Sequence, residues 1–192
     1  MEAARRRDFA ALLEDRRGHL DAPHFPEQVA AIVAAMTGAF RNGRKVLWFG
    51  NGGSAADAQH LAAEFSGRFL RERAGLPSEA LTVNTSALTA IANDFGFENV
   101  FVRQREAFVH PGDVVVGITT SGGARNIVRG LETAKRLGAT TVAFTGNGGG
   151  AVAKVADLIL LGPHGYSAIV QEVHITLGHI ICDLVEQELI YA

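Results

Sequence analysis

The sequence has little of several features that mark particular classes of protein. Its 192 residues include one cysteine, Cys182, so no internal disulfide can form and a reducing, cytosolic setting is expected. Cys182 lies in an apolar helical run outside any CxxC or metal-binding spacing, which favours a plain core residue over a nucleophile. The formal net charge of −2 argues against an electrostatic grip on nucleic acid.

Long apolar runs are also missing. No stretch approaches the roughly 20 apolar residues of a membrane span, so no membrane partner is expected. The basic N-terminus is not followed by the apolar region of a signal peptide. With 47% hydrophobic and 20% charged residues, the composition is that of a soluble globular protein of one main domain, expected in the cytoplasm.

Glycine, in contrast, is abundant and clustered. Three of its clusters, at residues 50–53, 122–123 and 146–150, each follow an apolar run that reads as a buried strand. Strands alternate with helical segments along the chain, and the right-handed crossover rule then predicts five parallel strands with helices on both faces. Glycine loops after strands are typical of a doubly wound α/β fold with a ligand at the carboxyl ends of its strands.

Two helices, over residues 3–20 and 26–41, precede the first strand. They either pack on the sheet or form an arm that meets another subunit. We expect an arm over residues 1–43 ahead of an α/β domain over residues 44–192, because a helical hairpin before a complete α/β unit has little else to bury against.

The first glycine loop, Gly50–Ser54, precedes a helix and formally fits the dinucleotide pattern GxGxxG/A. That pattern requires an acidic residue at the end of the second strand, and residues 83–85 contain none. The lysine of a Walker phosphate loop is absent as well. A nicotinamide, flavin or nucleoside triphosphate ligand is therefore disfavoured.

The second loop, Thr119–Ser121, places three hydroxyl groups between a buried strand and a helix. One helix cap needs only one such residue, so three hydroxyls followed by two glycines favour a bound phosphate monoester. Neither loop contains lysine or arginine, although Arg125 is near, and neutral donors suit a sugar phosphate.

His60 and Glu64 are four residues apart on the helix after the first loop, so both project from one face. Such a pair can share a metal ion such as zinc, or it can be an exposed helical pair with no ligand. Spacing alone leaves both interpretations open.

Four motifs in order resemble the SIS (sugar isomerase) superfamily and, within it, the phosphoheptose isomerase family. They are Gly50–Ser54, Asn93–Gly96, Thr120–Gly122, and Gln171-Glu172 ahead of His179. The resemblance covers about residues 27–189. It implies a flavodoxin-like sheet, a homotetramer, a bound zinc ion, and interconversion of sedoheptulose 7-phosphate and D-glycero-D-manno-heptose 7-phosphate in heptose biosynthesis.

The resemblance also implies site residues. Glu64 is the implied base and His179 the implied acid of an enediol mechanism. The implied zinc ligands are His60, Glu64, Gln171 and His179. The implied substrate contacts are Asn51, Gly52, Gly53, Ser54, Glu64, Asn93, Asp94, Thr119, Thr120, Ser121 and Gln171.

Spacing raises one difficulty for this ligand set. Gln171 and His179 are eight residues apart, which is about 12 Å along a straight helix and too far for both to reach one ion easily. Either the first turn of the helix is irregular or neighbouring subunits supply different ligands. His174 lies between them, and we expect a solvated or interface histidine there rather than a further ligand.

The chain departs from the family pattern at three places. Gly123-Ala124 replaces a loop segment that commonly carries a serine, residues 167–170 lack an Asp or Arg, and the second strand ends at Val83-Asn84, where an Asp is common. These changes put the exact sugar in doubt. The alternatives are an isomerase of another ketose phosphate and a non-catalytic SIS protein that binds sugar phosphates or a replication initiator. Glu64 and His179 favour an enzyme, and no DNA-binding module of a regulator is attached.

Overall fold

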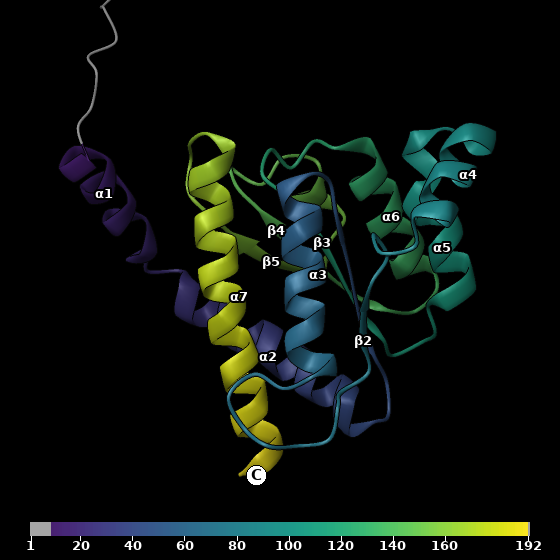
Figure 1. Ribbon diagram of the computed structural model, residues 1–192, viewed down its shortest axis with the longest axis horizontal. Helices are drawn as coiled ribbons and strands as arrows, with labels where there is room; N and C mark the ends of the chain where they lie inside the picture. The colour runs from purple at the N-terminus through teal and green to yellow at the C-terminus, as the bar shows by residue number, and fades with distance from the viewer. Residues whose placement is uncertain (1–8, 192) are drawn as a thin grey trace, which may run out of the picture.

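A parallel five-stranded sheet forms the centre of the molecule in the computed structural model, which describes residues 9–191 (Figure 1). Its strand order is β2-β1-β3-β4-β5, the order of flavodoxin-like folds. The predicted doubly wound sheet is therefore confirmed. The strands are β1 (Val46–Gly50), β2 (Ser78–Ala80), β3 (Val114–Thr119), β4 (Thr140–Thr145) and β5 (Leu158–Leu161).

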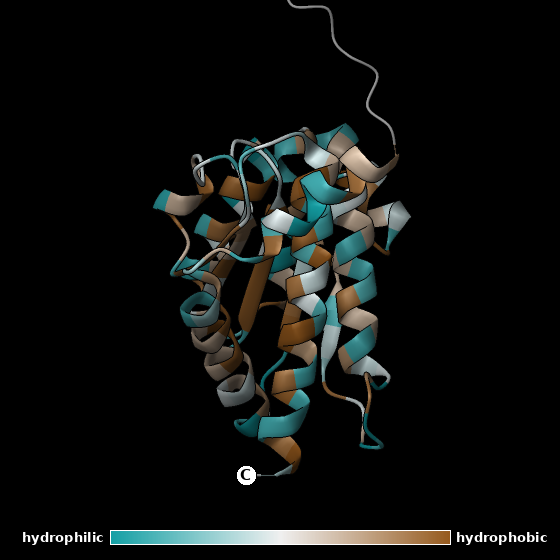
Figure 2. Ribbon diagram, turned by 90° about the vertical axis from the view of Figure 1, so that its left-hand side faces the viewer, coloured by the Kyte–Doolittle hydropathy of each residue, from teal (hydrophilic) through white to brown (hydrophobic). Residues whose placement is uncertain are grey.

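Burial explains why the central strands are continuous apolar runs. Every residue of β1 and β3 is buried, because helices cover both faces of the sheet. Figure 2 shows this arrangement as strongly hydrophobic strands between helices whose outer surfaces are hydrophilic. The edge strand β2 is only three residues long and ends at Ala80, before the expected end at Val83-Asn84.

Three helices cover one face of the sheet and share one hydrophobic core with it. Trp48, Phe65 and Phe144 form its aromatic centre, with ring centroids 6.0–6.2 Å from that of Trp48. This layer brings two helices distant in sequence side by side, and both carry predicted site residues. The three helices are α2 (Phe25–Arg41), α3 (Gly53–Ser66) and α7 (Ser167–Ile190).

The opposite face has a second core, between the sheet and α5 and α6. The motif Asn93–Gly96 lies at the end of a helix, since α4 continues through Phe95. The elements on this side are α4 (Thr85–Phe95), η2 (Phe97–Asn99), α5 (Val100–Phe108), α6 (Arg125–Arg136) and η3 (Val152–Lys154).

The expected arm has to be corrected for α2. Ile32 and Met36 on its apolar face are fully buried, and the helix packs on β5, β3 and α7 as part of the main core. A wide apolar stripe supplies enough burial to hold the helix on the sheet. Only α1 (Phe9–Arg17), followed by η1 (Gly18–Leu20), extends from the body, and it buries no residue (Figure 1). The predicted helix at residues 3–8 lies outside the described residues.

Helix α7 has the length and hydropathy of a membrane-crossing helix, and half of its most apolar window is buried inside the protein. Those buried side chains pack against α2 and α3. The core helix of a soluble protein meets the same criteria, so α7 reads as the central helix of this layer.

Candidate active site

Helix N-termini converge at the carboxyl edge of the sheet. α3 begins directly after β1, α6 begins a few residues after β3, and α7 begins beside them. Between them lies an open cavity of about 380 Å³. We call it the loop pocket; it is lined by Asn51, Gly52, Gly53, Ser54, Ile118, Thr119, Thr120, Ser121, Ala124, Ser167 and Gln171.

The loop pocket is built for an anion without using a cation. Its lining residues include five hydroxyl side chains and no lysine or arginine. Unpaired backbone N–H groups and the dipole of a helix N-terminus both favour a bound anion. Arg125, which we expected to assist, is exposed and is not part of the lining.

Two close approaches bring α7 onto the loops. A Cβ atom at Gly53 would lie 2.5 Å from Nε2 of Gln171, so the glycine allows the end of that side chain to lie close to the first turn of α3. The hydroxyl of Ser167, the first residue of α7, lies 3.1 Å from the hydroxyl of Thr120. Ser167 was not among the predicted substrate contacts, although its hydroxyl at the start of a helix, four residues before Gln171, was the available signal.

Asn51 is held by a residue that sequence analysis missed. Its side-chain amide and that of Asn126, in the first turn of α6, exchange two hydrogen bonds of 2.9 and 2.8 Å. Asn126 is 4% exposed, so the side chain that orients Asn51 is itself held in the protein interior. This pairing leaves one N–H of the Asn51 amide free to face a ligand.

A second cluster lies further along the same two helices. Nε2 of His60 is 3.1 Å from Oε1 of Glu64 and 3.0 Å from Nε2 of His179. One ligand atom from each of these residues lies within 4.8 Å of the others. We call His60, Glu64 and His179 the triad; α3 supplies the first two and α7 the third.

The triad fits a zinc ion. Two imidazoles and a carboxylate are a common donor set for catalytic zinc, which leaves one position for water or substrate. Two ligands of a tetrahedral zinc at bond lengths near 2.05 Å lie about 3.3 Å apart, close to the 3.1 and 3.0 Å that separate His60 from Glu64 and from His179. The side chains of His60 and Glu64 are 50% and 24% exposed, so the site is open to solvent on one side.

Two neighbours shape the triad. The Phe69 ring stacks on the His179 ring, with centroids 5.5 Å apart and planes inclined by 24°. Asp57, one turn before His60 on α3, has a buried carboxylate oxygen without a hydrogen-bond partner in residues 9–191. Burial raises the pKa of the Asp57 carboxyl, while the nearby His60 lowers it. Neither neighbour was identified from the sequence.

The remaining expected site residues lie in two places. Gln171 lines the loop pocket, where it was expected as a substrate contact. Asn93 and Asp94 are exposed in the last turn of α4 and do not line the loop pocket. Figure 1 shows α4 on the side of the molecule away from α7.

The remaining histidine and the cysteine are core residues. His174 is fully buried, which overturns the expectation of a solvated or interface residue; its Nε2 lies 3.1 Å from the carbonyl oxygen of Thr145. Burial lowers the pKa of His174 to about 4, so the ring is neutral at pH 7. Cys182 is buried as predicted, and burial raises the pKa of its thiol.

Similarity to known proteins agrees with this arrangement. A profile of the SIS domain family matches residues 24–146. The phosphoheptose isomerase of Aquifex aeolicus is 54% identical over 163 residues, which cover 85% of each chain. The chain belongs to the phosphoheptose isomerase family of SIS domain proteins.

Solved structures of phosphoheptose isomerases have the same fold. The protein from Francisella tularensis superposes with a TM-score of 0.86 at 34% sequence identity, over 93% of this chain and 94% of that one. The protein from Neisseria gonorrhoeae gives 0.81 at 39% identity, over 91% of both chains. The family match begins at residue 24, just before α2, which agrees with the place of that helix in the core.

Proposed function

We propose that the protein is an aldose–ketose isomerase that interconverts sedoheptulose 7-phosphate and D-glycero-D-manno-heptose 7-phosphate. One observation carries this: a cation-free pocket at three helix N-termini lies beside a His-Glu-His triad on two of the same helices. A phosphate monoester in the pocket leaves the sugar chain to extend toward the triad. The identity to phosphoheptose isomerases supports the choice of sugar.

The loop pocket holds the phosphate in this proposal. Thr119, Thr120, Ser121 and Ser167 offer hydroxyl groups from two sides, and the starts of α3, α6 and α7 offer backbone donors. Ala124 lines the pocket without a hydroxyl, and Ser167 supplies one from the opposite wall. Asn51, Gly52, Gly53, Ser54 and Gln171 then border the sugar next to the phosphate.

Glu64 and His179 move the protons. Isomerisation transfers a proton between adjacent carbons through an enediol, which requires a base at carbon and a proton donor at oxygen. Glu64 is the base, and His179 donates to and accepts from the substrate oxygens. Both belong to the triad, which residues of α3 and α7 form together.

Zinc is the proposed metal, one ion per site, held by His60, Glu64 and His179 before turnover. An atom bound to the ion cannot also exchange a proton with the sugar, so the proposal includes ligand exchange that frees Glu64 and His179 during turnover. When bound, it would polarise the carbonyl and the neighbouring hydroxyl of the sugar. Gln171 remains a fourth ligand in the proposal only if its side chain turns away from Gly53, which it touches here.

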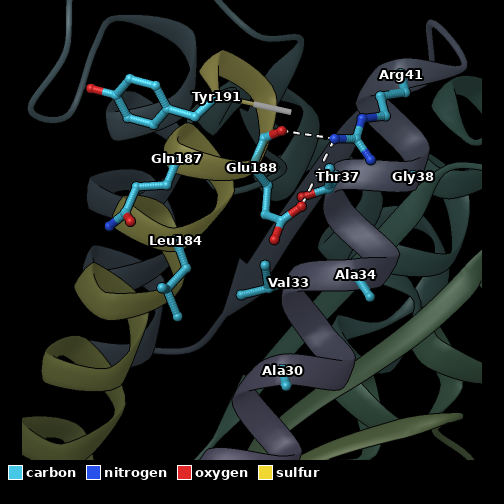
Figure 3. A pocket seen from close by; sticks show the side chains of 10 residues that line it. All are labelled: Ala30, Val33, Ala34, Thr37, Gly38, Arg41, Leu184, Gln187, Glu188 and Tyr191. Carbon is cyan, nitrogen blue, oxygen red and sulfur yellow. Dashed lines mark hydrogen bonds and ion pairs between the residues drawn. The ribbon is translucent and has the colours of Figure 1, made fainter.

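We also propose a homo-oligomer, with the tetramer as its form. A groove of about 720 Å³ runs between α2 and α7, lined by small side chains of α2 such as Ala30 and Ala34 (Figure 3). Because Asn93 and Asp94 lie away from the loop pocket of their own chain, a role in substrate binding requires a second copy. The enzyme is proposed to be soluble and cytoplasmic, which its ordinary globular composition and single cysteine support.

The experiment that tests the function is isomerisation of sedoheptulose 7-phosphate by the zinc-loaded protein. Glu64→Gln keeps the size of the side chain and removes the base. We therefore expect a melting temperature close to that of the wild type and a turnover that is lower by about 10²-fold or more. Ser66→Ala, at the end of the same helix, is the control and should remain active.

A panel of five- to seven-carbon ketose phosphates identifies the sugar. If a different sugar is turned over faster, the protein is an isomerase of that ketose phosphate. If the loaded protein binds sedoheptulose 7-phosphate and leaves it unchanged, the non-catalytic alternative holds.

A further inference from the structure

The segment between α3 and β2, residues 67–77, runs across α7 before it returns to the sheet (Figure 1). We call it the strap. It contains no regular secondary structure, so its backbone hydrogen-bonding groups need partners elsewhere. Three of its backbone N–H groups are held by one side chain of α7.

That side chain is Glu186, which is fully buried. Its carboxylate accepts hydrogen bonds from the backbone N–H groups of Phe69, Leu70 and Arg71 at 2.9–3.0 Å. It also accepts one from Nε of Arg73 at 2.8 Å. Four donors on one carboxylate, one of them charged, make this the firmest polar anchor of the strap.

Arg73 links the carboxylate of Glu186 to the end of α3. Its guanidinium donates to the carbonyl oxygens of Glu64 and Phe65 at 2.8 Å each, in the last turn of that helix. The last carbonyls of a helix have no partner within it, and a cation there is stabilising. The backbone of Glu64 is therefore tied to Glu186 through a single side chain.

Phe69 links the strap to His179 of α7. Its N–H is held by Glu186, and its ring stacks on His179. His179 and Glu186 are seven residues apart on α7, which is two turns and about 10 Å along one helix face. The strap thus bridges these two positions from outside.

We propose that Glu186 is a positioning residue for the triad: it fixes the Phe69 ring against His179 and, through Arg73, the helix turn that carries Glu64. The inference rests on the proposed function only in taking the triad as a metal site. Metal ligands from two helices must keep their relative positions within about 0.5 Å, and such support belongs to groups around the ligands.

The test measures metal binding without any sugar. Glu186→Gln keeps the shape, but its amide N–H₂ cannot accept hydrogen bonds from the strap. We expect a folded protein whose affinity for Zn²⁺ falls about 10- to 100-fold, with an altered visible absorption spectrum of the Co²⁺-loaded protein. The spectrum reports ligand geometry, which a loss of stability alone would not change.

Asp183→Asn is the matched control. Asp183 lies on the same helix and pairs with the side chain of Arg71 in the same strap, but it contacts neither the strap backbone nor Arg73. It should keep the wild-type affinity and Co²⁺ spectrum. If Asp183→Asn changes them as much as Glu186→Gln does, any loosening of the strap suffices and the proposal is wrong.

Two further variants decide the matter if Glu186→Gln fails to fold. Phe69→Leu leaves the backbone hydrogen bonds to Glu186 intact and removes the ring that stacks on His179. Arg73→Lys removes the guanidinium group that donates to the last carbonyl oxygens of α3. Both should shift the Co²⁺ spectrum. Wild-type affinity and spectrum in both, or in folded Glu186→Gln, would overturn the inference, as would a wild-type protein that binds neither metal. A protein that binds metal as expected but isomerises no sugar contradicts the proposed function alone.

Discussion

At the scale of single residues, Arg105 is the most costly side chain in the fold. It is fully buried, and none of its guanidinium nitrogens has a hydrogen-bond partner within residues 9–191. Its central carbon lies 3.4 Å from the centre of the Phe49 ring, and Gly130 leaves room for its tip. Burial holds the pKa of Arg105 well below its usual range. A cation–π contact contributes about 2 kcal/mol at most, less than the several kcal/mol of desolvation that opposes it.

Arg105→Met is therefore expected to raise the free energy of unfolding, by about 1–3 kcal/mol, because a flexible apolar side chain fills the same space without a buried charge. Urea unfolding monitored by circular dichroism measures this free energy of unfolding. Arg103→Met, on the exposed face of the same helix, should change stability by about 1 kcal/mol or less. A large loss on replacing Arg105 would reveal a partner for its guanidinium in the assembled protein.

His174 makes stability depend on pH. Its pKa is about 4 in the folded chain, against 6.5 for the free side chain. Between these values the unfolded chain binds a proton that the folded chain does not, so stability present above pH 6.5 is lost as the pH falls toward 4. The loss is on the order of 3 kcal/mol.

His174→Gln should abolish this component. The stability difference between wild type and variant, from urea unfolding at several pH values, should narrow by that amount between pH 7 and pH 4. The exposed His164 serves as the control. The stability difference between wild type and His164→Gln should be the same at every pH from 7 to 4. A constant difference for His174→Gln would mean that the folded ring protonates as readily as the unfolded one.

At the scale of elements, the contact between α3 and α7 sets the geometry of the triad. Gly178 lies within α7, where glycine costs about 1 kcal/mol relative to alanine. The reason is close packing, since a Cβ atom there would lie 2.8 Å from both methyl carbons of Leu61. Gly178 precedes His179, and Leu61 follows His60, so this contact is adjacent to the site on both helices.

Gly178→Ala should lower the free energy of unfolding by about 1–3 kcal/mol despite the better helix propensity of alanine, because the new methyl group overpacks the interface. Adding Leu61→Ala removes the obstructing methyl groups. In a double-mutant cycle the pair should then be less destabilising than the sum of the single changes. If Gly178→Ala alone is more stable than wild type, the helices are free to move apart and the contact does not set their spacing.

At the scale of the whole molecule, the groove of about 720 Å³ between α2 and α7 is a concave surface separate from the proposed active site. Figure 3 shows Val33 of α2 on the side of Leu184 of α7, with Arg41 and Glu188 bonded at one end of the groove. Ala34 is exposed in this groove. Such a surface suits close packing of another helix, and a second copy is the occupant that the proposed oligomer requires.

Ala34→Arg should therefore reduce the oligomer to a smaller species, because a long charged side chain in the groove blocks close approach. Light scattering coupled to size-exclusion chromatography measures the mass. Ala107→Arg, at an exposed position of α5, is the control and should keep the wild-type mass. An unchanged mass for Ala34→Arg would place the subunit contacts elsewhere.

Sequence by itself determined the sheet, the glycine and hydroxyl loops at its carboxyl edge, and the pairing of His60 with Glu64. These follow from local patterns: continuous apolar runs for strands, glycines after them, and a spacing of four on one helix. The resemblance added His179 to that pair, and in the structure the three side chains lie together.

Tertiary structure alone decided how helices distant in sequence meet. It placed α2 on the sheet, buried His174, set Gln171 against Gly53, and brought Glu186 under the strap. No local pattern contains these facts, because they depend on how closely two helices approach. That distance is set by a few small residues, such as Gly178 against Leu61, whose role becomes visible only when both sides of the contact are known.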